Sequence, residues 1–142
     1  DARIACWDAK YAINFWRPVT AIRHADEDGN PATDADPNWT PLVVTPSFPE
    51  YVSAHTTISS AMATVLRLLF DDDPGVTFIA TSPTNPGFDR HWTTFSEGAL
   101  EVIDARVYGG IHFRSSDERG AKLGRQIGGF AATHAFRLSH GA

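Results

Sequence analysis

Residues 53–70 read SAHTTISSAMATVLRLLF and decide the fold. Large apolar side chains recur there at three- and four-residue steps: Ile58, Met62, Val65, Leu66 and Leu69. That spacing is the period of an amphipathic helix. Ser53 stands before the first turn, where a serine oxygen can accept a hydrogen bond from an unpaired backbone N–H group. We therefore expect a helix that begins at Ser53 and ends near Phe70, before the helix-breaking residues 71–75.

The same period predicts a helix on the N-terminal side, over residues 3–16. Its apolar side chains are Ile4, Trp7, Tyr11 and Phe15. Lys10 and Arg17 are seven residues apart, or two helical turns, so they fall on nearly the same face. Pro18 either ends this helix or opens a short one that reaches Ile22.

Two further helices are expected on the C-terminal side. The first begins after Thr94 or Ser96 and reaches Tyr108, with three side chains pointing inward: Leu100, Ile103 and Val107. Gly109 and Gly110 end it. The last helix covers residues 116–138 and carries Gly120, Gly124 and Gly128 at four-residue spacing. Each glycine costs a helix about 1 kcal/mol relative to alanine, so three on one face predict a closely packed neighbouring helix.

Two long irregular stretches separate these helices. The first, residues 24–51, contains five prolines: Pro31, Pro37, Pro41, Pro46 and Pro49. Val43 and Val44 are expected to form a brief extended piece within it. The second runs from residue 71 to about residue 94. Strand patterns are otherwise almost absent, so the sequence predicts one all-α domain over residues 1–142, a helical bundle with two long loops.

Composition excludes several classes of function. The net charge of −5 over 142 residues argues against non-specific binding to nucleic acid, which needs a surplus of Lys and Arg. No run of 18 apolar residues occurs, so no membrane-spanning helix is predicted. Cys6 is the only cysteine, cannot form a disulfide within the chain, and is expected to be a buried thiol. The chain starts at Asp1 without an initiator methionine, which we interpret as a fragment or a processed product.

Three separate segments carry residues suited to a tetrahedral oxyanion such as phosphate or vanadate. The donors are Lys10, Arg17, Arg106 and the helix start at Ser53-Ala54-His55. Arginine offers forked hydrogen bonds, lysine a point charge, and a helix start its free N–H groups. His112 follows Arg106 by six residues, across a glycine turn that can bring it back beside the anion. Each residue alone is more often a surface charge, a helix cap or a structural histidine; the ordered set favours a site.

The motifs resemble those of a known superfamily. The spacings K-x6-R-P from Lys10, Ser-x-His from Ser53 and R-x5-H from Arg106 resemble vanadium-dependent haloperoxidases and the related type 2 phosphatidic-acid-phosphatase-like (PAP2-like) acid phosphatases. The stretches that look like the fungal chloroperoxidase branch are Asn14-Phe15-Trp16-Arg17-Pro18-Val19, Phe48-Pro49-Glu50-Tyr51 and Gly110-Ile111-His112-Phe113-Arg114. The likeness covers most of residues 3–130. Two positions differ from the family pattern: Ala54 stands where glycine is usual, and Ala105 where serine is usual.

The resemblance implies a role for each matched residue. The oxygens of vanadate or phosphate would be held by Lys10, Arg17, Arg106, the Ser53 hydroxyl and the Ala54 backbone N–H. His112 would be the vanadium ligand in a haloperoxidase, or the nucleophile that forms a phosphohistidine in a phosphatase. His55 would be the general acid–base. Phe48, Trp16 and Phe15 would form an apolar wall at the halide site, which favours the haloperoxidase.

The resemblance also implies what lies outside this chain. Family enzymes are longer, and their N-terminal half packs as a second helical bundle that supplies a carboxylate orienting the acid–base histidine. Such a half, or a second copy of the chain, is therefore the expected partner, beside the small substrates hydrogen peroxide, halide or phosphoester. A non-catalytic remnant of the fold is the third alternative. The compartment stays open, with the resemblance pointing to a soluble, secreted or periplasmic protein.

The remaining polar clusters are interpreted as structural or exposed. His24, His91, His134 and His140 match no metal-ligand spacing. The acidic runs 26–28 and 71–73 lack the alternation of a calcium loop. Three tryptophans are expected to anchor the core or the loops: Trp7, Trp39 and Trp92.

Overall fold

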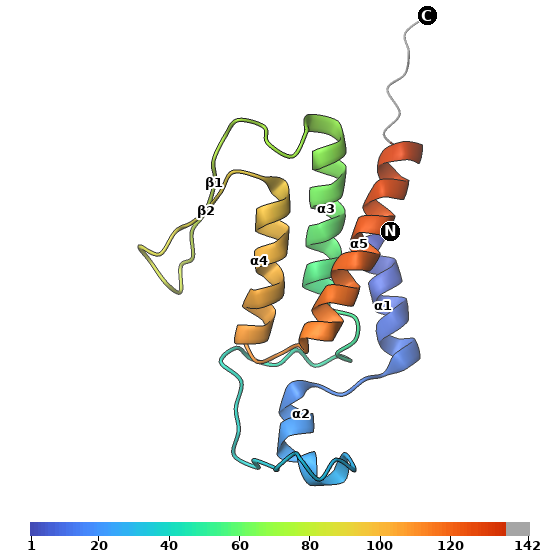
Figure 1. Cartoon of the computed structure of the whole chain (residues 1–142), viewed down its shortest axis with the longest axis vertical. Helices are drawn as coiled ribbons and strands as arrows, with labels where there is room; N and C mark the ends of the chain where they lie inside the picture. The colour runs from blue at the N-terminus through green and yellow to red at the C-terminus, as the bar shows by residue number, and fades with distance from the viewer. Residues whose placement is uncertain (136–142) are drawn as a thin grey trace, which may run out of the picture.

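Helix α3 (Ala54–Phe70) lies between α4 (Phe95–Tyr108) and α5 (Arg114–His134) in the computed structural model (Figure 1). The structure describes residues 1–135. The chain begins with α1 (Ala2–Ile13), α2 (Pro18–Arg23) and a 3₁₀ turn, η1 (Ala25–Glu27). The predicted helical bundle with two long connecting segments is confirmed.

The tightest contact in the bundle is between α3 and α5, and the three predicted glycines form it. A Cβ added at Gly120 would lie 2.5 Å from Thr56 Oγ1, and one at Gly128 would lie 2.5 Å from the Ala61 carbonyl oxygen. At Gly124 it would overlap the carbonyl oxygen of Thr57. The expected close approach of a neighbouring helix is therefore confirmed, and α3 is that helix.

The buried face of α3 is made of small and hydroxyl-bearing residues: Thr56, Thr57, Ser60, Ala61 and Thr64. The hydroxyls of Thr56 and Thr57 both donate to the Ser53 carbonyl oxygen, at 3.2 and 2.7 Å. Such bonds to the preceding turn let hydroxyls be buried with a partner. Small side chains on α3 and glycines on α5 together permit the short distance between the helices.

The apolar stripes predicted for the helices lie largely on the surface. Met62 on α3 is 61% exposed and Ile4 on α1 is 72% exposed. On α4, Leu100 is 57% exposed, so its predicted inward position is wrong, while Ile103 and Val107 are half-buried. Helical periodicity identifies the apolar side of a helix, but here the side facing the bundle is the polar, small one.

Several predicted helix ends differ in detail. Helix α1 stops at Ile13 because Asn14 adopts a left-handed conformation with φ of 50° and donates its N–H to the Lys10 carbonyl. Pro18 occupies the first turn of α2. The predicted side-chain cap at Ser53 is wrong, because its hydroxyl makes no capping bond.

At the other helices the ends are set by different residues. Thr94 rather than Ser96 caps α4, where it forms a reciprocal capping box with Glu97. Helix α5 begins at Arg114, two residues before the predicted start. Its predicted last residues, 136–138, lie outside the described part of the chain.

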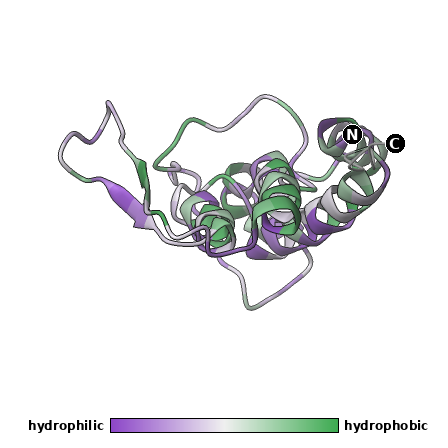
Figure 2. Ribbon diagram, turned by 90° about the horizontal axis from the view of Figure 1, so that it is seen from above, coloured by the Kyte–Doolittle hydropathy of each residue, from purple (hydrophilic) through white to green (hydrophobic). Residues whose placement is uncertain are grey.

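The second irregular stretch contains a short hairpin that the sequence did not predict. Strands β1 (Phe78–Ala80) and β2 (Arg90–Trp92) pair antiparallel, with Ile79 opposite His91. Figure 2 shows the hydrophobic β1 beside the hydrophilic β2 at one side of the bundle. Three residues per strand are too few for a clear alternating pattern. The extended piece expected at Val43 and Val44 is not a strand.

The segments that carry the predicted site meet at one end of the bundle. The start of α3, the end of α4, the start of α5 and the end of α1 all lie at this end, over the loop between α2 and α3 (Figure 1). The turn between α4 and α5 requires Gly110, which has φ of 71° and packs against Trp39. Among the described residues no helix is long and apolar enough to cross a membrane.

Candidate functional site

A pocket of about 370 Å³ opens at this end of the bundle. Five predicted site residues line it: Phe48, Ala54, His55, Arg106 and His112. The remaining lining residues are Arg3, Trp7, Ile58 and Ser59. Residues from the second and third predicted segments therefore line one cavity, and Arg17 of the first segment contacts His112 in its wall.

His112 lies in the floor of the site, only 4% exposed. Its Nδ1 is 2.6 Å from Glu50 Oε1, and its Nε2 is 3.2 Å from Arg17 Nη1. The pKa of His112 is lowered to about 4, chiefly because burial disfavours the charged ring, while the bond to Glu50 opposes that shift. His112 is therefore a neutral imidazole near neutral pH.

Lys10 and Arg17 reach the site, and both bind main-chain oxygens there. Lys10 is fully buried and donates from Nζ to the carbonyl oxygens of Pro49 and Glu50, at 2.9 and 2.8 Å. Burial lowers the pKa of Lys10 to about 8. Arg17 donates to the carbonyls of Phe48 and Ile111, at 3.0 and 2.8 Å. These cations therefore hold the floor of the site, and each retains donors beyond those used.

Two other predicted donors make no hydrogen bond of good geometry within the described residues. The Ser53 hydroxyl is fully buried and faces the Asp117 carboxylate, and Nε of Arg106 is buried without a hydrogen bond. The N–H of Ala54 lies in the first turn of α3, where backbone donors have no helical acceptor. Buried donors without acceptors are costly, so this arrangement fits an anion that accepts from all of them. The residues thus fit a tetrahedral oxyanion such as vanadate or phosphate.

His55 lies at the pocket rim, in the first turn of α3. Its side chain stays exposed, yet the surrounding protein lowers its pKa below 6.5, first by burial and then through the charges of Arg106 and Lys10. It is therefore neutral near pH 7 and can accept a proton.

Sequence reasoning missed two buried carboxylates, Glu50 and Asp117. Glu50 stands within the quoted stretch Phe48-Pro49-Glu50-Tyr51, close to Ser53, and a lone acid in so apolar a run was the available signal. Asp117 is fully buried, and burial raises its pKa to about 6. The Ser53 hydroxyl faces it and opposes that shift, although neither carboxylate oxygen makes a hydrogen bond of good geometry.

The aromatic wall differs from the prediction in its members. Phe48 lines the pocket, and its ring lies 5.1 Å from both Lys10 Nζ and the Arg17 guanidinium carbon. Trp7 packs edge-on against Phe48, with ring centroids 4.7 Å apart. Trp16 does not line the pocket of this chain, and its assignment to the wall stays a prediction. Phe15 packs against Phe113 instead.

The other polar residues follow their structural interpretation where the structure describes them. His24, His91 and His134 are exposed, and His140 lies outside the described residues. Within residues 1–135 no group of three His, Cys, Asp or Glu side chains is placed to hold a metal ion. The Cys6 thiol is buried, as predicted, and faces the Val52 carbonyl oxygen at 3.5 Å.

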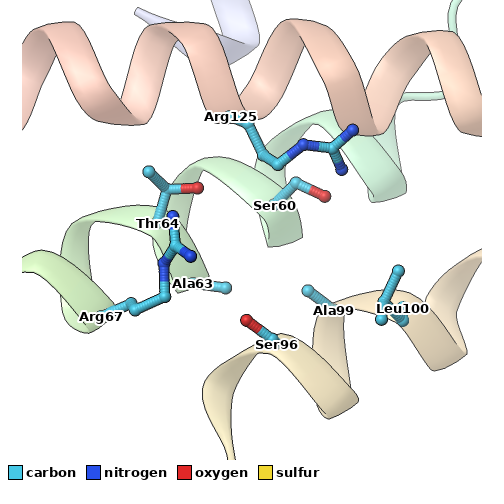
Figure 3. Close-up of a pocket in the computed structure, with 8 residues that line it drawn as sticks. All are labelled: Ser60, Ala63, Thr64, Arg67, Ser96, Ala99, Leu100 and Arg125. Atoms are coloured by element: carbon cyan, nitrogen blue, oxygen red, sulfur yellow. The ribbon is translucent and has the colours of Figure 1, made fainter. Parts of the chain in front are cut away.

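A second pocket, of about 170 Å³, lies between α3, α4 and α5 away from this site. Figure 3 shows Arg67 and Arg125 beside the hydroxyls of Ser60, Thr64 and Ser96. Both arginines are exposed, and no histidine borders the pocket. It offers charge for an anion but no nitrogen ligand.

The fold and the site define a helical-bundle domain with a pocket lined by two histidines and two arginines. The family model described as the VCPO second helical-bundle domain matches residues 1–141. The chain belongs to this family, and its relatives are vanadium haloperoxidases.

Individual relatives agree with that assignment. The vanadium chloroperoxidase of Curvularia inaequalis is 31% identical over 99 residues, which is 63% of this chain and 15% of the relative. A bacterial vanadium-dependent iodoperoxidase structure matches 93% of the chain with a TM-score of 0.79 and 36% identity. The apo form of a bacterial vanadium-dependent chloroperoxidase matches 93% of the chain at a TM-score of 0.75 and 28% identity. The chain spans 15% of the first relative and 30% and 33% of these two structures.

Proposed function

We propose that this chain carries the vanadate site of a haloperoxidase, which oxidises halide with hydrogen peroxide to hypohalous acid. One observation carries the proposal: His112 presents a neutral ring to a pocket that Arg106 also lines, and Nε of Arg106 is buried without a hydrogen bond. That is a nitrogen ligand next to an oxyanion cradle. The relatives' names supply the reaction class.

The binding residues divide into two groups in this proposal. Nε of Arg106 and the Ala54 N–H have no acceptor as the site stands, and the Ser53 hydroxyl, which faces Asp117, would turn with them to the anion's oxygens. Lys10 and Arg17 add charge from beneath, and Arg17 turns its Nη1 from His112 Nε2 toward an anion oxygen. Arg17 would then exchange its contact with a neutral nitrogen for a charge-assisted hydrogen bond.

His55 moves the proton. Bound vanadate would act as a Lewis acid that polarises peroxide for attack by halide. His55, held neutral by burial and by Arg106, takes a proton from the incoming peroxide at the pocket rim and can return it to the leaving oxygen. The rings of Phe48 and Trp7 cover one side of the pocket and exclude water from the place where a halide approaches.

An acid phosphatase is the second candidate, and the same contacts favour it. Phosphate matches vanadate in shape and charge, so the cradle of Ser53, Ala54 and Arg106 suits both. A neutral His112 whose Nε2 lone pair is released when Arg17 turns away is also what a phosphohistidine mechanism needs as its nucleophile.

Two assays on one preparation separate these candidates. Vanadate-loaded protein with peroxide and bromide, chloride or iodide is expected to halogenate an indicator dye, and the H112A variant is expected not to. The vanadate-free protein is offered p-nitrophenyl phosphate at acidic pH. Turnover of the phosphoester without halogenation would replace the first proposal with the second. Failure of both assays would leave a non-catalytic remnant of the fold.

A further inference from the structure

Glu50 connects the parts of the candidate site to one another. Its Oε1 accepts from His112 Nδ1 at 2.6 Å and from the Phe113 N–H at 3.1 Å. Its carbonyl oxygen accepts from Lys10 at 2.8 Å, and its own N–H donates to the Phe15 carbonyl at 3.0 Å. The side chain is fully buried and does not line the pocket.

Two contacts fix the tautomer of His112. The guanidinium of Arg17 can only donate, so the 3.2 Å contact places the lone pair of His112 on Nε2. The proton of the neutral ring then lies on Nδ1, where the Glu50 carboxylate accepts it. Both neighbours require the same tautomer, and it leaves Nε2 as the nitrogen that can bond to another atom.

We propose that Glu50 is a positioning residue that makes His112 selective for an oxyanion whose central atom accepts a nitrogen ligand. When a carboxylate accepts a hydrogen bond from one ring nitrogen of a metal-binding imidazole, it orients the ring and makes the other nitrogen a stronger electron-pair donor to the metal. The inference rests on the proposed function and adds to it a reason for preferring vanadate over phosphate. It involves no change in the protonation of either residue.

The negative charge of Glu50 should affect the binding of phosphate and the binding of vanadate differently. As a buried negative charge next to the site, it repels every anion that enters. An anion held only through its oxygens, such as phosphate in its ground state, gains nothing from a stronger Nε2 donor. An anion that bonds to Nε2, such as vanadate, gains from it. Removal of the charge should therefore weaken vanadate binding and leave phosphate binding unchanged or tighter.

The variant that isolates this effect is Glu50→Gln. Glutamine places an oxygen where Glu50 Oε1 stands, so the bonds from His112 and Phe113 can persist while the charge is lost. The chain offers a matched control in the exposed pair of His24 and Glu27, whose Nδ1 and Oε1 atoms are 3.0 Å apart. Glu27→Gln makes the same chemical change outside the site.

Equilibrium dialysis against orthovanadate and, separately, inorganic phosphate gives the two affinities for wild type, E50Q, E27Q and H112A. We expect E50Q to lose about 10-fold or more in vanadate affinity, as is typical when such a partner is changed, with phosphate affinity not reduced. E27Q should change neither. Equal losses of vanadate and phosphate affinity in E50Q would show a merely structural role and would overturn the inference. An unchanged ratio of the two affinities would likewise overturn it, because Glu50 would then confer no selectivity. Vanadate binding that survives in H112A would overturn the proposed function itself.

A measurement on the unmodified protein covers the case in which E50Q does not fold. Long-range ¹H–¹⁵N correlation spectra of histidine-labelled protein report which ring nitrogen carries the proton. We expect His112 to be protonated on Nδ1 and bare on Nε2. The opposite tautomer would contradict the inference whatever the variants do.

Discussion

Residues 1–135 contain two Glu–His pairs, and the difference between them lies in their surroundings. Glu50 and His112 are 62 residues apart in sequence, and their side chains are 0% and 2% exposed. Glu27 and His24 are three residues apart, with side chains 69% and 54% exposed. The first pair has a distance of 2.6 Å and the second 3.0 Å.

Burial gives the first pair consequences that the second lacks. The pKa of His112 falls to about 4, and the ring is fixed from both sides by Glu50 and Arg17. In the exposed pair water can replace either partner, so the contact carries little free energy. A Glu–His contact therefore becomes part of a site only where the surrounding fold excludes the water that would compete for it.

The largest expected effect comes from removing the histidine of each pair. His112→Ala deletes the nitrogen ligand and should reduce vanadate affinity by more than about 100-fold, beyond the usual cost of losing a ligand's partner. His24→Ala should leave it unchanged. Equilibrium dialysis measures both. Similar affinities in the two variants would show that burial confers no role on His112.

Removing the carboxylate from the buried pair should lower the free energy of unfolding much more than removing it from the exposed pair. Glu50→Ala leaves the His112 Nδ1–H and the Phe113 N–H buried without an acceptor and should cost about 3–5 kcal/mol of the free energy of unfolding. Glu27→Ala should change it by less than about 0.5 kcal/mol. Urea unfolding of the two variants gives the comparison. A cost below 1 kcal/mol for Glu50→Ala would mean that water reaches the buried pair.

Asp117 is a third case, a buried carboxylate without an ion pair among the described residues. Its pKa is raised to about 6 by burial and then by Glu50, while Ser53, Arg106 and Arg114 oppose the shift. The folded state therefore keeps a proton that the unfolded chain releases above pH 3.8, and stability is lost as pH rises from about 4 to about 6.

The Asp117→Asn variant should remove that loss. We expect it to be more stable than wild type by about 2–3 kcal/mol at pH 7.5 and to gain nothing at pH 4, since each pKa unit corresponds to about 1.4 kcal/mol. Urea unfolding at the two pH values measures the gain. An equal effect at both pH values would assign it to packing rather than to charge.

The smallest expected effects come from glycine substitutions in α5. Gly124→Ala places a methyl group against the Thr57 carbonyl, so α5 must move from α3 at a cost of about 1–3 kcal/mol. Gly129→Ala, in the same helix, meets no atom within 4 Å and should stabilise by about 0.5–1 kcal/mol. Thermal unfolding compares them. A neutral Gly124→Ala would contradict the close contact between α3 and α5.

The parts of the fold that depend on local pattern were predictable. The spacing of Gly120, Gly124 and Gly128 predicted a close helix contact, and the run from Ser53 to Phe70 predicted the helix that the structure shows to be its partner. The hairpin was missed because three-residue strands carry almost no alternation. The orientation of α3 was misjudged because its apolar side is exposed in this chain, and only packing reveals which side is covered.

The candidate site was predictable in its donors and not in their partners. Three spaced motifs named Lys10, Arg106 and His112 because cations and histidines are recognisable at fixed spacing. Glu50 remained unassigned because its role depends on a contact 62 residues away and on complete burial. Trp16 was assigned to the wall from its neighbours in sequence, whereas Trp7, one helix earlier, reaches the pocket.

A crystal structure of the protein soaked in orthovanadate tests the central claim most directly. We expect vanadium bonded to Nε2 of His112, its oxygens contacted by Arg106, Ser53 and the Ala54 N–H, and Arg17 turned from the ring toward the anion. Anomalous scattering from vanadium at Arg67 and Arg125 alone, or no vanadium with Arg17 still on His112, would contradict the account.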